Sequence, residues 1–504
     1  KRQKKFLSLV LALVMTMSLV TVSAGAKDFA DDSKITYKEA VDVMSAAKVI
    51  DGYTDGSFNP TATLTRGAAA KIICNLILGP TTASALVADA APYKDVPTNH
   101  TFAGYIAYCQ KEKIISGYAD GTFRPAASLT GYAFMKMLLG ALGYDAEVEQ
   151  YTGANWSINV AKRAMNIGLK DGLIGDFNGV KAVTREEACL YAFNTLQATM
   201  VEYSAKTSVS TNGTTVVIAG SEAKDVVNTG KTDSNIDKDG KMQFAEKYFE
   251  DLKLDKTSDD FGRPANKWNV KKEEVGTYAN TPDATFTKKV TKADVYNAIG
   301  KTVYDDLKDG DATLTTYFDG FETKVKAADV DSTWANKNDT GKVNSTGNGD
   351  LTEIYVDDDN NVTIVTIRTY VFQAATDYDA KKESVNLTQD GSKADNLTNA
   401  AKTIVLNDRT VEAEDYAVVK DLKADDYVLV TAVKNGSGYD VKSVEKAEVK
   451  TVEVSGYKLN DSVDAASTTY KYNANADSIK GTSYNVGKQA TLCLLYTSPS
   501  PRDR

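Results

Sequence analysis

Two arginines in the sequence are placed where they could bind an anion. Arg66 follows Thr65 and Arg185 follows Thr184, and Thr is a favourable residue just before the first turn of a helix. Each Arg then lies in the first turn of a predicted helix, where backbone N–H groups lack a partner within the helix. A guanidinium beside such N–H groups suits a carboxylate, which it can bind through two parallel hydrogen bonds. The alternative is a solvated surface Arg, which contributes little.

The scarcity of histidine limits the chemistry of the chain. His100 is the single histidine among 504 residues, so a Ser-His-Asp triad would depend on it and a His-rich zinc site cannot be built. No nucleophile stands near His100 in the sequence, and a structural or surface role is expected for it. No Gly-rich phosphate loop, nucleophile elbow or paired-carboxylate motif stands out in the second half. The sequence therefore predicts a protein that is not an enzyme and uses no cofactor.

One acidic segment has the spacing of a calcium-binding loop. The first position of this EF-hand pattern is Asn instead of the usual Asp, the second is apolar, and no convincing helix precedes it. An acidic turn that caps the following helix is the favoured interpretation, and no metal site is predicted apart from this candidate. The residues that would supply oxygen ligands are Asn235, Asp237, Asp239 and Glu246.

Three cysteines lie in apolar helical contexts: Cys74, Cys109 and Cys189. None shows the Cys-x-x-Cys spacing of a metal or redox site. We predict buried free thiols that pack as small hydrophobic side chains. A fourth cysteine, Cys493, belongs to the C-terminal segment considered below.

The charge balance excludes one broad class of partner. The chain has 59 basic and 68 acidic residues, a net charge of −9 and a pI near 5.1. A general nucleic-acid-binding protein needs a basic face against phosphate, so no nucleic-acid partner is expected. The length suggests about three domains.

An internal repeat organises the first half of the chain. Residues 51–66 and 116–131 share the order Gly-Tyr-x-Asp-Gly-x-Phe-x-Pro, at an offset of 65 residues. A third, more divergent copy runs from Trp156 to Ala188. Each copy predicts an amphipathic helix, a turn loop and a second helix capped by Thr. A unit of this size cannot bury its own apolar face, so the three copies should pack together.

These copies resemble the S-layer homology family. The Phe-x-Asp opening of that family appears at residues 29–31 and, as Tyr-Lys-Asp, at residues 93–95. Its Thr-Arg-x-Glu-Ala helix start is complete only at residues 184–188, and residues 65–69 read Thr-Arg-Gly-Ala-Ala. The resemblance covers about residues 27–203, well under half of the chain.

The resemblance implies a helical bundle with pseudo-threefold symmetry, whose grooves hold a secondary cell-wall polysaccharide that often carries a pyruvate ketal. The anion-binding Arg of the family falls on Arg66 and Arg185. Gly131 occupies the third such position, so that groove is expected to bind weakly or not at all. Aromatic side chains would stack on a sugar face at Trp156 and Phe102. The acids of the two openings complete the candidate polysaccharide-binding set: Asp31 and Asp95.

The second half of the chain changes character. From about residue 204 it is rich in Thr, Val, Asp, Lys and Asn, and short alternating segments are separated by turn signals. This pattern is typical of β-sandwich or barrel modules. The predicted elements are a hairpin over 351–371, strands over 214–218, 427–433 and 449–454, and helices over 242–252 and 293–304, the second capped by Thr291.

The two ends of the chain are not expected to belong to the fold. Residues 1–26 have a basic start, an apolar run and a small-x-small site, which indicate a secretory signal peptide; a membrane anchor is the alternative. After cleavage no transmembrane segment is expected. Residues 493–504 resemble the translation of an adapter used in sequencing libraries, with a natural Pro-rich tail as the alternative. On the first interpretation the natural sequence continues differently past residue 492.

These observations predict a multidomain protein, in which a mainly α-helical three-repeat bundle is followed by α/β and β-rich modules of sandwich or barrel type. The predicted divisions are the signal peptide (1–26), three repeats (27–80, 91–145 and 151–203), a mixed α/β region (204–340), a β-rich region (341–492) and the adapter-like tail (493–504).

Two functions compete. The first is a secreted S-layer-like surface protein, held non-covalently on secondary cell-wall polysaccharide and peptidoglycan-associated glycan. It would display β-rich modules outside the cell and could assemble into a surface layer. The second is a wall-anchored extracellular enzyme, such as a polysaccharide hydrolase, whose catalytic part is truncated or unrecognised. The near-absence of His and the Thr-, Asn-, Lys- and Asp-rich composition favour the first.

Overall fold

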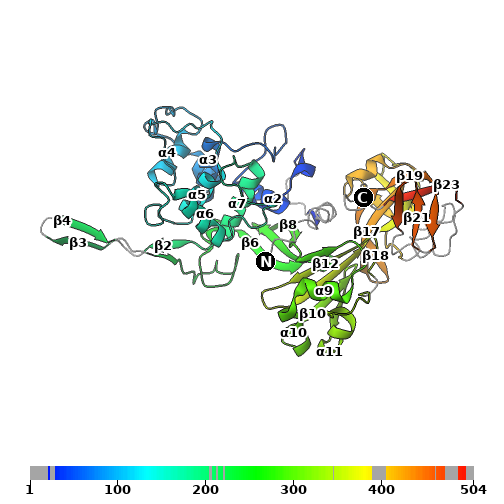
Figure 1. The fold of residues 1–504 in the computed structure, drawn as a ribbon. Coiled ribbons are helices and arrows are strands. Elements are labelled where there is room, and N and C mark those ends of the chain that lie inside the picture. The colour runs from blue at the N-terminus through cyan, green and yellow to red at the C-terminus, as the bar shows by residue number, and fades with distance from the viewer. Residues whose placement is uncertain are drawn as a thin grey trace. The chain divides into compact units, whose positions relative to one another are not determined.

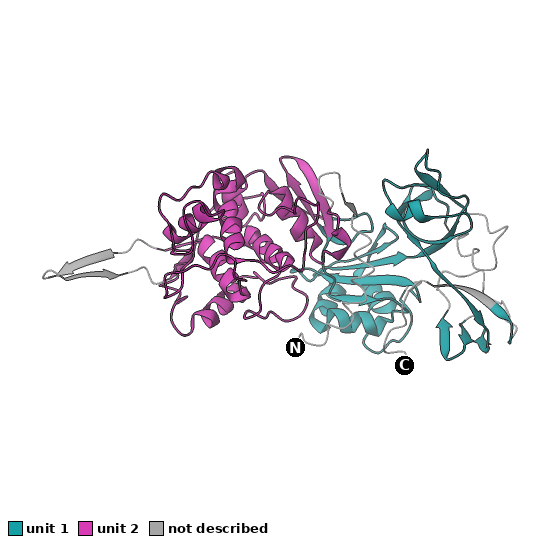
Figure 2. Cartoon of the chain, turned by 90° about the horizontal axis from the view of Figure 1, so that it is seen from above, with its two compact units in different colours: residues 1–21, 258–265, 279–504 teal, residues 22–257, 266–278 magenta. Residues whose placement is uncertain are grey.

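The computed structural model divides the chain into two compact units, coloured separately in Figure 2. Unit 2 comprises residues 22–257 and 266–278, and unit 1 comprises residues 258–265 and 279–504 together with 1–21. The predicted signal sequence, apart from residues 21–22, and the tail from residue 495 lie outside the described residues. The structure describes residues 21–22, 29–203, 207–211, 214–218, 222–343, 346–388, 404–459, 461–471 and 486–494.

Unit 2 is mainly helical up to residue 197, as the sequence predicts (Figure 1). No helix among the described residues is long and apolar enough to cross a membrane. The helices of unit 2 are α2 (Lys38–Ala46), α3 (Arg66–Ser84), α4 (Ala103–Lys111), α5 (Gly131–Ala141), α6 (Trp156–Asn166), α7 (Arg185–Gln197) and α8 (Phe244–Tyr248).

Threonine hydroxyls start the second helix of each predicted repeat. The side chains of Thr65, Thr130 and Thr184 accept hydrogen bonds from backbone N–H groups in the first turns of α3, α5 and α7. At α7 the cap is part of a capping box, in which the Glu187 side chain accepts a hydrogen bond from Thr184 N–H. Gly79, with φ 74°, breaks the helical backbone inside α3, close to the predicted end of that helix.

A closed ring of backbone hydrogen bonds joins the segments that lead into these three helices. Leu64 N–H donates to Val183 O (2.9 Å), Val183 N–H to Leu129 O (2.9 Å), and Leu129 N–H to Leu64 O (2.8 Å). All three side chains are buried. A second ring surrounds the first, because the first N–H of each helix donates to the next segment: Arg66 to Ala127 O, Gly131 to Lys181 O and Arg185 to Ala62 O, at 2.9, 3.0 and 2.8 Å.

A strand region downstream of the helices packs on α2 within unit 2. Trp268 is fully buried, and its Nε1–H donates to Glu39 Oε1 at 2.7 Å. The Tyr278 hydroxyl donates to Asp42 Oδ2 at 2.7 Å. Burial raises the pKa of both carboxyl groups, Glu39 and Asp42. The hydrogen bonds from Trp268 and Tyr278 partly offset this rise. The strands are β6 (Leu252–Ser258), β7 (Pro264–Val270) and β8 (Glu273–Ala279), in a sheet of order β1-β8-β7-β6 with β1 (Thr21–Val22) at its edge.

The segment that connects the helices to this sheet corrects one prediction. The helix expected over 242–252 is confirmed in position but wrong in length, because α8 ends at Tyr248 and Leu252 already begins β6. Backbone hydrogen bonds tie the segment to the helical part, from Phe244 N to Ala198 O at 3.0 Å and from Met200 N to Met242 O at 2.8 Å. Two strand pairs lie nearby in sequence: β2 (Val201–Tyr203) with β5 (Ala223–Asp225), and β3 (Thr207–Thr211) with β4 (Thr214–Ile218).

Unit 1 contains a five-stranded sheet of order β11-β10-β13-β12-β9. The predicted hairpin is confirmed: β12 pairs antiparallel with β13 across the turn at residues 357–361. The parallel pairing of β10 with β13 means that the predicted boundary between residues 340 and 341 runs through one sheet. The strands are β9 (Ala284–Phe286), β10 (Leu314–Phe318), β11 (Phe321–Val325), β12 (Asp350–Val356) and β13 (Val362–Arg368).

Two short helices cover one face of this sheet. Helix α9 (Lys292–Ile299) starts at a capping box formed by Thr291 and Asp294, which confirms the predicted cap. Gly300, with φ 83°, separates it from α10 (Lys301–Asp309), so the predicted helix over 293–304 is in fact two. Their apolar side chains share one core with strand residues, including Val295, Ile299, Leu307, Ile354 and Ile364.

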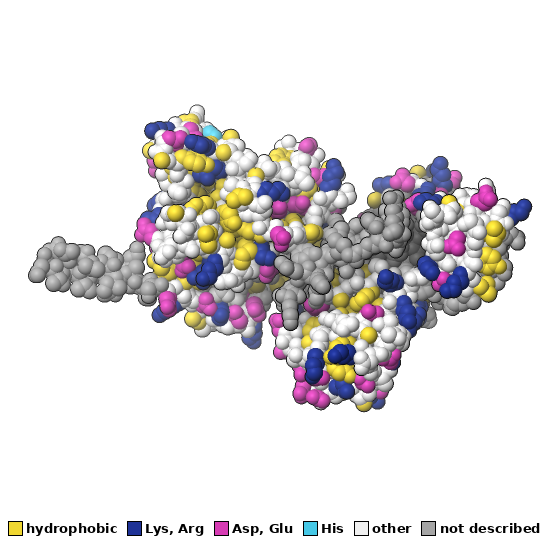
Figure 3. All heavy atoms as spheres, in the orientation of Figure 1, with side chains coloured by type: hydrophobic (Ala, Val, Ile, Leu, Met, Phe, Trp, Pro, Cys, Tyr) yellow, Lys and Arg dark blue, Asp and Glu magenta, His cyan; other side chains and the backbone are white. Residues whose placement is uncertain are grey.

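The C-terminal part of unit 1 is β-rich, as predicted. A second five-stranded sheet of order β16-β15-β14-β17-β18 encloses a core that includes Tyr370, Phe372 and Val428. On the face seen in Figure 3, acidic and basic side chains are interspersed. The strands of this part are β14 (Tyr370–Ala374), β15 (Ser384–Thr388), β16 (Thr410–Glu412), β17 (Tyr427–Asn435), β18 (Gly438–Lys446), β19 (Glu448–Glu453), β20 (Gly456–Lys458), β21 (Ser462–Ala465), β22 (Thr468–Lys471) and β23 (Gln489–Leu494).

Asp319 is a buried acid in unit 1. Its carboxylate accepts hydrogen bonds from Arg368 N–H (2.8 Å) and from the Tyr370 hydroxyl (2.6 Å), and its side chain has no exposed surface. Burial raises the pKa of Asp319 to about 6 from an ordinary value of 3.8. The folded state therefore binds this proton more tightly than the unfolded state, and stability is lost as the pH rises through the window between these two values.

We expect the variant Trp268→Phe to lower the thermal stability of unit 2. The change removes the N–H donor of a buried carboxylate, and such a loss costs about 1–3 kcal/mol. Thermal unfolding of the full chain measures this loss of stability. The matched control is Glu39→Gln, because Gln keeps an acceptor for Trp268 without a buried charge. A fragment ending at residue 203 lacks both donors and should melt below one ending at 278. An unchanged melting temperature in Trp268→Phe would contradict this account.

We expect Asp319→Asn to flatten the pH dependence of stability in unit 1. In the parent the free energy of unfolding should fall by an amount on the order of 3 kcal/mol between about pH 4 and pH 6. The Asn variant keeps an acceptor for Arg368 N–H but does not titrate. Urea unfolding at a series of pH values measures the slope, and Asp358→Asn, in the exposed hairpin turn, is the control. If the stability of Asp319→Asn depended on pH as steeply as that of the parent, Asp319 would not be the cause of the pH dependence.

Candidate functional site

Arg66 reaches from the start of α3 onto the loop of the second predicted repeat. Its Nε donates to Phe123 O at 2.7 Å and its Nη2 to Ser116 O at 3.1 Å. The guanidinium carbon lies 4.3 Å from the centroid of the Phe123 ring and 5.0 Å from that of Tyr118. Two carbonyl groups and two aromatic rings therefore fix this guanidinium in place.

Arg185 repeats this arrangement at the start of α7, on the loop of the first predicted repeat. Its Nε donates to Phe58 O at 2.9 Å and its Nη2 to Asp51 O at 2.8 Å. The guanidinium carbon lies 4.7 Å from the Tyr53 ring centroid and 4.9 Å from that of Phe58. The two arginines thus have corresponding partners, atom by atom, one repeat apart.

Neither guanidinium forms an ion pair with a carboxylate of the described residues. Both side chains are half-buried, and burial lowers the pKa of Arg66. The hydrogen bonds they make use Nε and Nη2, which leaves Nη1 of each without a hydrogen-bond partner among the described residues. Each site therefore offers a fixed, uncompensated positive charge with donors to spare, which is the chemistry of an anion site.

The expected contribution of free helix N–H groups is wrong. The first N–H of α3 donates to Ala127 O, the second to Pro125 O at 2.9 Å, and the third to the Thr65 hydroxyl at 3.2 Å. The first three N–H groups of α7 are used in the same way, by Ala62 O, Pro60 O and the Thr184 hydroxyl. The guanidinium groups, and not the helix ends, are the available donors.

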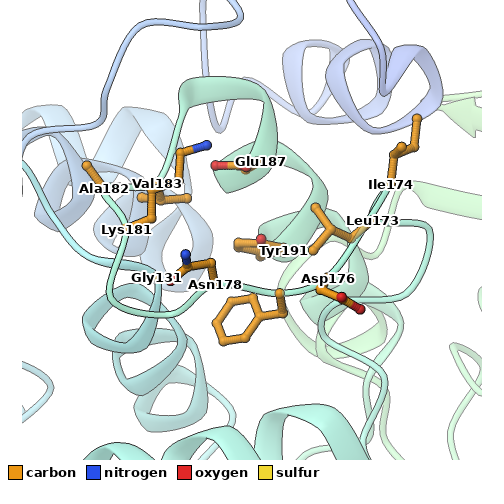
Figure 4. A pocket seen from close by; sticks show the side chains of 11 residues that line it. Gly131, Leu173, Ile174, Asp176, Asn178, Lys181, Ala182, Val183, Glu187 and Tyr191 are labelled. Atoms are coloured by element: carbon orange, nitrogen blue, oxygen red, sulfur yellow. The ribbon is translucent and has the colours of Figure 1, made fainter.

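The third position has Gly131 in place of an Arg, and Lys181 lines the space beside it. A Cβ on Gly131 would lie 3.2 Å from Gly179 Cα and 3.2 Å from Phe177 Cε2, so an Arg here would force the loop to move. A cavity of about 150 Å³ opens beside it; Figure 4 shows Tyr191 and Glu187 among its lining residues. Phe177 packs edge-on against Tyr132 and Tyr191, with ring centroids 5.7 and 5.9 Å apart.

The two predicted sugar-stacking residues lie at different positions. Phe102 immediately precedes α4 and covers Gly67, next to Arg66: a Cβ on Gly67 would lie 2.4 Å from Phe102 Cδ2. Trp156 begins α6 and lies near the third position, edge-on to Tyr132 with ring centroids 6.5 Å apart. Both are half-buried. His100 accepts a hydrogen bond from Phe102 N–H through Nδ1 at 3.1 Å, a structural contact.

The two predicted acids are directed at their own loops. Asp31 accepts hydrogen bonds from Phe58 N–H (2.7 Å) and Asn59 N–H (2.9 Å). Asp95 likewise accepts from Phe123 N–H and Arg124 N–H, both at 2.7 Å. Burial alone would raise the pKa of each acid, but these backbone hydrogen bonds outweigh it and lower the pKa below its ordinary value. Both carboxylates thus hold the loops that the arginines contact.

The calcium-loop candidates also serve the local fold. Glu246 accepts hydrogen bonds from the Asn228 side chain (2.7 Å) and from Ile236 N–H (3.3 Å) and forms a capping box at the start of α8. The Asn235 side chain donates to a backbone carbonyl at 2.9 Å, and Asp239 accepts from Lys241 N–H at 2.9 Å. No group of three His, Cys, Asp or Glu side chains among the described residues is arranged to hold a metal ion. Asp237 contributes its backbone N–H to Glu246, so these residues form hydrogen bonds within the turn that precedes α8, as in the favoured interpretation of an acidic turn.

The aromatic partners of the arginines escaped the sequence analysis. Tyr53 and Tyr118 flank Arg185 and Arg66 respectively. Both belong to the repeated Gly-Tyr pair at residues 52–53 and 117–118, which was the available signal. Because the ring and the Arg come from different repeats, only their packing brings them together.

The N-terminal part of the chain is similar to known proteins. The model of the S-layer homology domain matches residues 28–70 and 92–131. The chain is 25% identical over 175 residues to a surface layer protein of Brevibacillus choshinensis (34% of this chain, 15% of that protein). It is 34% identical over 106 residues to a cellulosome-anchoring protein of Acetivibrio thermocellus (21% and 24%). It is 27% identical over 156 residues to an uncharacterized cell wall amidase of Bacillus anthracis (29% and 28%).

The matched part of the chain spans less than a third of each of these relatives. Two of these relatives are named for the surface layer or the cell wall, and the third is named for anchoring the cellulosome. The chain thus contains sequence that matches the S-layer homology domain and is similar to proteins named for the cell surface, the cell wall or the S-layer.

Proposed function

We propose that unit 2 binds an anionic secondary polysaccharide of the cell wall through Arg66 and Arg185. The observation that carries the proposal is the pair of half-buried guanidinium groups, held alike by carbonyls and rings and without a carboxylate partner among the described residues. Desolvating a charge is costly unless an opposite charge arrives, so each site favours a ligand carboxylate. A pyruvate ketal on a sugar supplies one.

Other residues take distinct roles in this proposal. Phe102 offers an apolar face to a sugar ring beside Arg66, and Trp156 does so at the third position. Asp31 and Asp95 position the loops and do not contact the glycan, because their oxygens already accept backbone hydrogen bonds. The third position, with Gly131 in place of an Arg, would contribute less to binding.

Residues 151–203 act as the third repeat in this proposal. Support comes from the two rings of backbone hydrogen bonds, in which Val183 and Arg185 occupy the same places as the residues of the first two copies. The capping box at Thr184 supports it as well. Three copies around one axis give the pseudo-threefold bundle that the resemblance implies.

In this proposal the β-rich part of unit 1 is displayed outside the cell, and the protein assembles with other copies into a surface layer. Peptidoglycan-associated glycan is a further binding partner of the protein. A wall-anchored enzyme is the second candidate, favoured by the likeness to a protein named as a cell wall amidase. The likeness to the surface layer protein and the cellulosome-anchoring protein favours the structural role.

We expect Arg66→Ala and Arg185→Ala each to weaken binding of the full chain to purified cell walls. Losing a charge-assisted hydrogen bond costs about 1.5–3 kcal/mol, or about 10- to 100-fold in affinity. Arg163→Ala is the matched control, because that guanidinium is already paired with Glu149 at 2.8 Å. Co-sedimentation with walls, before and after removal of the secondary polysaccharide, measures the effect. Two Arg variants that bind like the parent, or full binding to stripped walls, would refute the assignment.

We expect Asp95→Asn to destabilise unit 2 and to weaken wall binding only as a consequence. Asn keeps one acceptor but turns an N–H toward a backbone donor, and leaving one such bond unmade costs about 1–3 kcal/mol. Thermal unfolding should show a lower melting temperature than in Asp89→Asn, an exposed control in the same unit. A variant of unchanged stability and reduced binding would mean that Asp95 contacts the glycan directly.

A further inference from the structure

Two buried thiols meet where α3 packs on α4. Cys74 Sγ and Cys109 Sγ are 3.6 Å apart, and neither residue has exposed surface. Each sulfur also lies near a carbonyl of the opposite helix, Cys74 Sγ at 3.5 Å from Tyr105 O and Cys109 Sγ at 3.7 Å from Ala70 O. The side chains therefore point at each other across the helix contact. Cys189 is equally buried, on α7, and no sulfur contact is recorded for it among the described residues.

We propose that Cys74 and Cys109 are a modification site, at which an organic disulfide oxidises the pair to a disulfide bond in the exported protein. One cysteine thiolate attacks the oxidant R–S–S–R, forms a mixed disulfide and releases one R–S⁻. The second thiolate attacks the protein sulfur of that mixed disulfide, and the S–S bond to R breaks. The net change is two cysteine thiols and one R–S–S–R giving one protein disulfide and two R–SH, with the two thiol protons passing to the two leaving thiolates.

The approach required of the two sulfurs is small. A disulfide has a sulfur–sulfur distance of about 2.05 Å, so the atoms must come about 1.5 Å closer than the 3.6 Å seen here. Side-chain rotation moves sulfur atoms over such distances, and no other group lies between these two. The location of the protein agrees, because disulfides persist in secreted and cell-surface proteins.

The packing also decides when the reaction takes place. The hydrogen bond with Cys74 and burial raise the pKa of the Cys109 thiol well above its ordinary value, so the reactive thiolate is scarce in the folded state. No oxidant can reach sulfurs without exposed surface. Oxidation therefore belongs to folding, before α3 and α4 close on each other, and the finished bond is shielded from reductants.

The cross-link would bear on the candidate site. It would join the helix that begins at Arg66 to the helix capped by Phe102 and enclose the segment 75–108 between them. A disulfide that closes a loop of this length restricts the unfolded chain, and the expected rise in melting temperature is about 5–10 °C. The inference does not depend on what the arginines bind.

The test compares two preparations of the unaltered full chain. Both are refolded from denaturant, one with oxidised glutathione and one with a reductant, then denatured, treated with iodoacetamide and mapped by peptide mass spectrometry. In the oxidised sample we expect a peptide pair joined through Cys74 and Cys109, lighter by two hydrogen atoms than its reduced parts, with Cys189 and Cys493 alkylated. The oxidised protein should also melt about 5–10 °C higher than the reduced protein.

Three outcomes would overturn the proposal. They are full alkylation of Cys74 and Cys109 after refolding with oxidised glutathione, a principal cross-link that involves Cys189 or Cys493, and equal melting temperatures of the two preparations. Cys189→Ser is the matched control variant, because it removes a buried thiol that lies outside the pair and should leave the cross-link in place.

Discussion

The ring of backbone hydrogen bonds through Leu64, Leu129 and Val183 places the helix starts that carry Arg66, Gly131 and Arg185 in unit 2. Each ring residue is followed by the Thr that caps a helix and then by the residue at position 66, 131 or 185. Once the ring closes, the residue at position 66, 131 or 185 must lie against the loop of the neighbouring segment. The site geometry is therefore a property of three chain segments together and of none alone.

This constraint explains why the arginines are suited to an anion. The neighbouring loops take up the helix N–H groups with backbone carbonyls, and two further carbonyls hold each guanidinium. Carbonyl dipoles orient a cation but do not neutralise it, and the lowered pKa of Arg66 reflects its desolvation. A carboxylate bound there, as proposed, would meet a donor that is already ordered, so less side-chain entropy would be lost on binding.

Local signals in the sequence predicted what local physics determines. The Thr caps, the Asp-Gly turns and the hairpin at residues 351–371 depend on neighbours in the chain, and all are found. What could not be predicted depends on distant partners. Trp268 and Glu39 are 229 residues apart, yet the hydrogen bond between them holds β7 against α2, the first helix of the first repeat. The sheet that joins β10 to β13 crosses the predicted boundary at residue 340 for the same reason, since alternation gives no strand order.

An aspartate found in the first two copies has no counterpart in the proposed third copy. In the first two copies Asp31 and Asp95 bind the N–H groups of Phe58 and Phe123, and both rings are buried in the core. The sequence between residues 144 and 156 contains no aromatic-x-Asp opening, so the loop around Phe177 has no equivalent acid to hold it. Phe177 is half-buried and packs on Tyr132 and Tyr191 instead. Its ring then occupies the space an Arg would need at position 131, and the cavity of about 150 Å³ lies next to it. Because Phe177 Cε2 lies only 3.2 Å from the place of a Cβ on residue 131, the position of this ring is consistent with Gly there and not Arg.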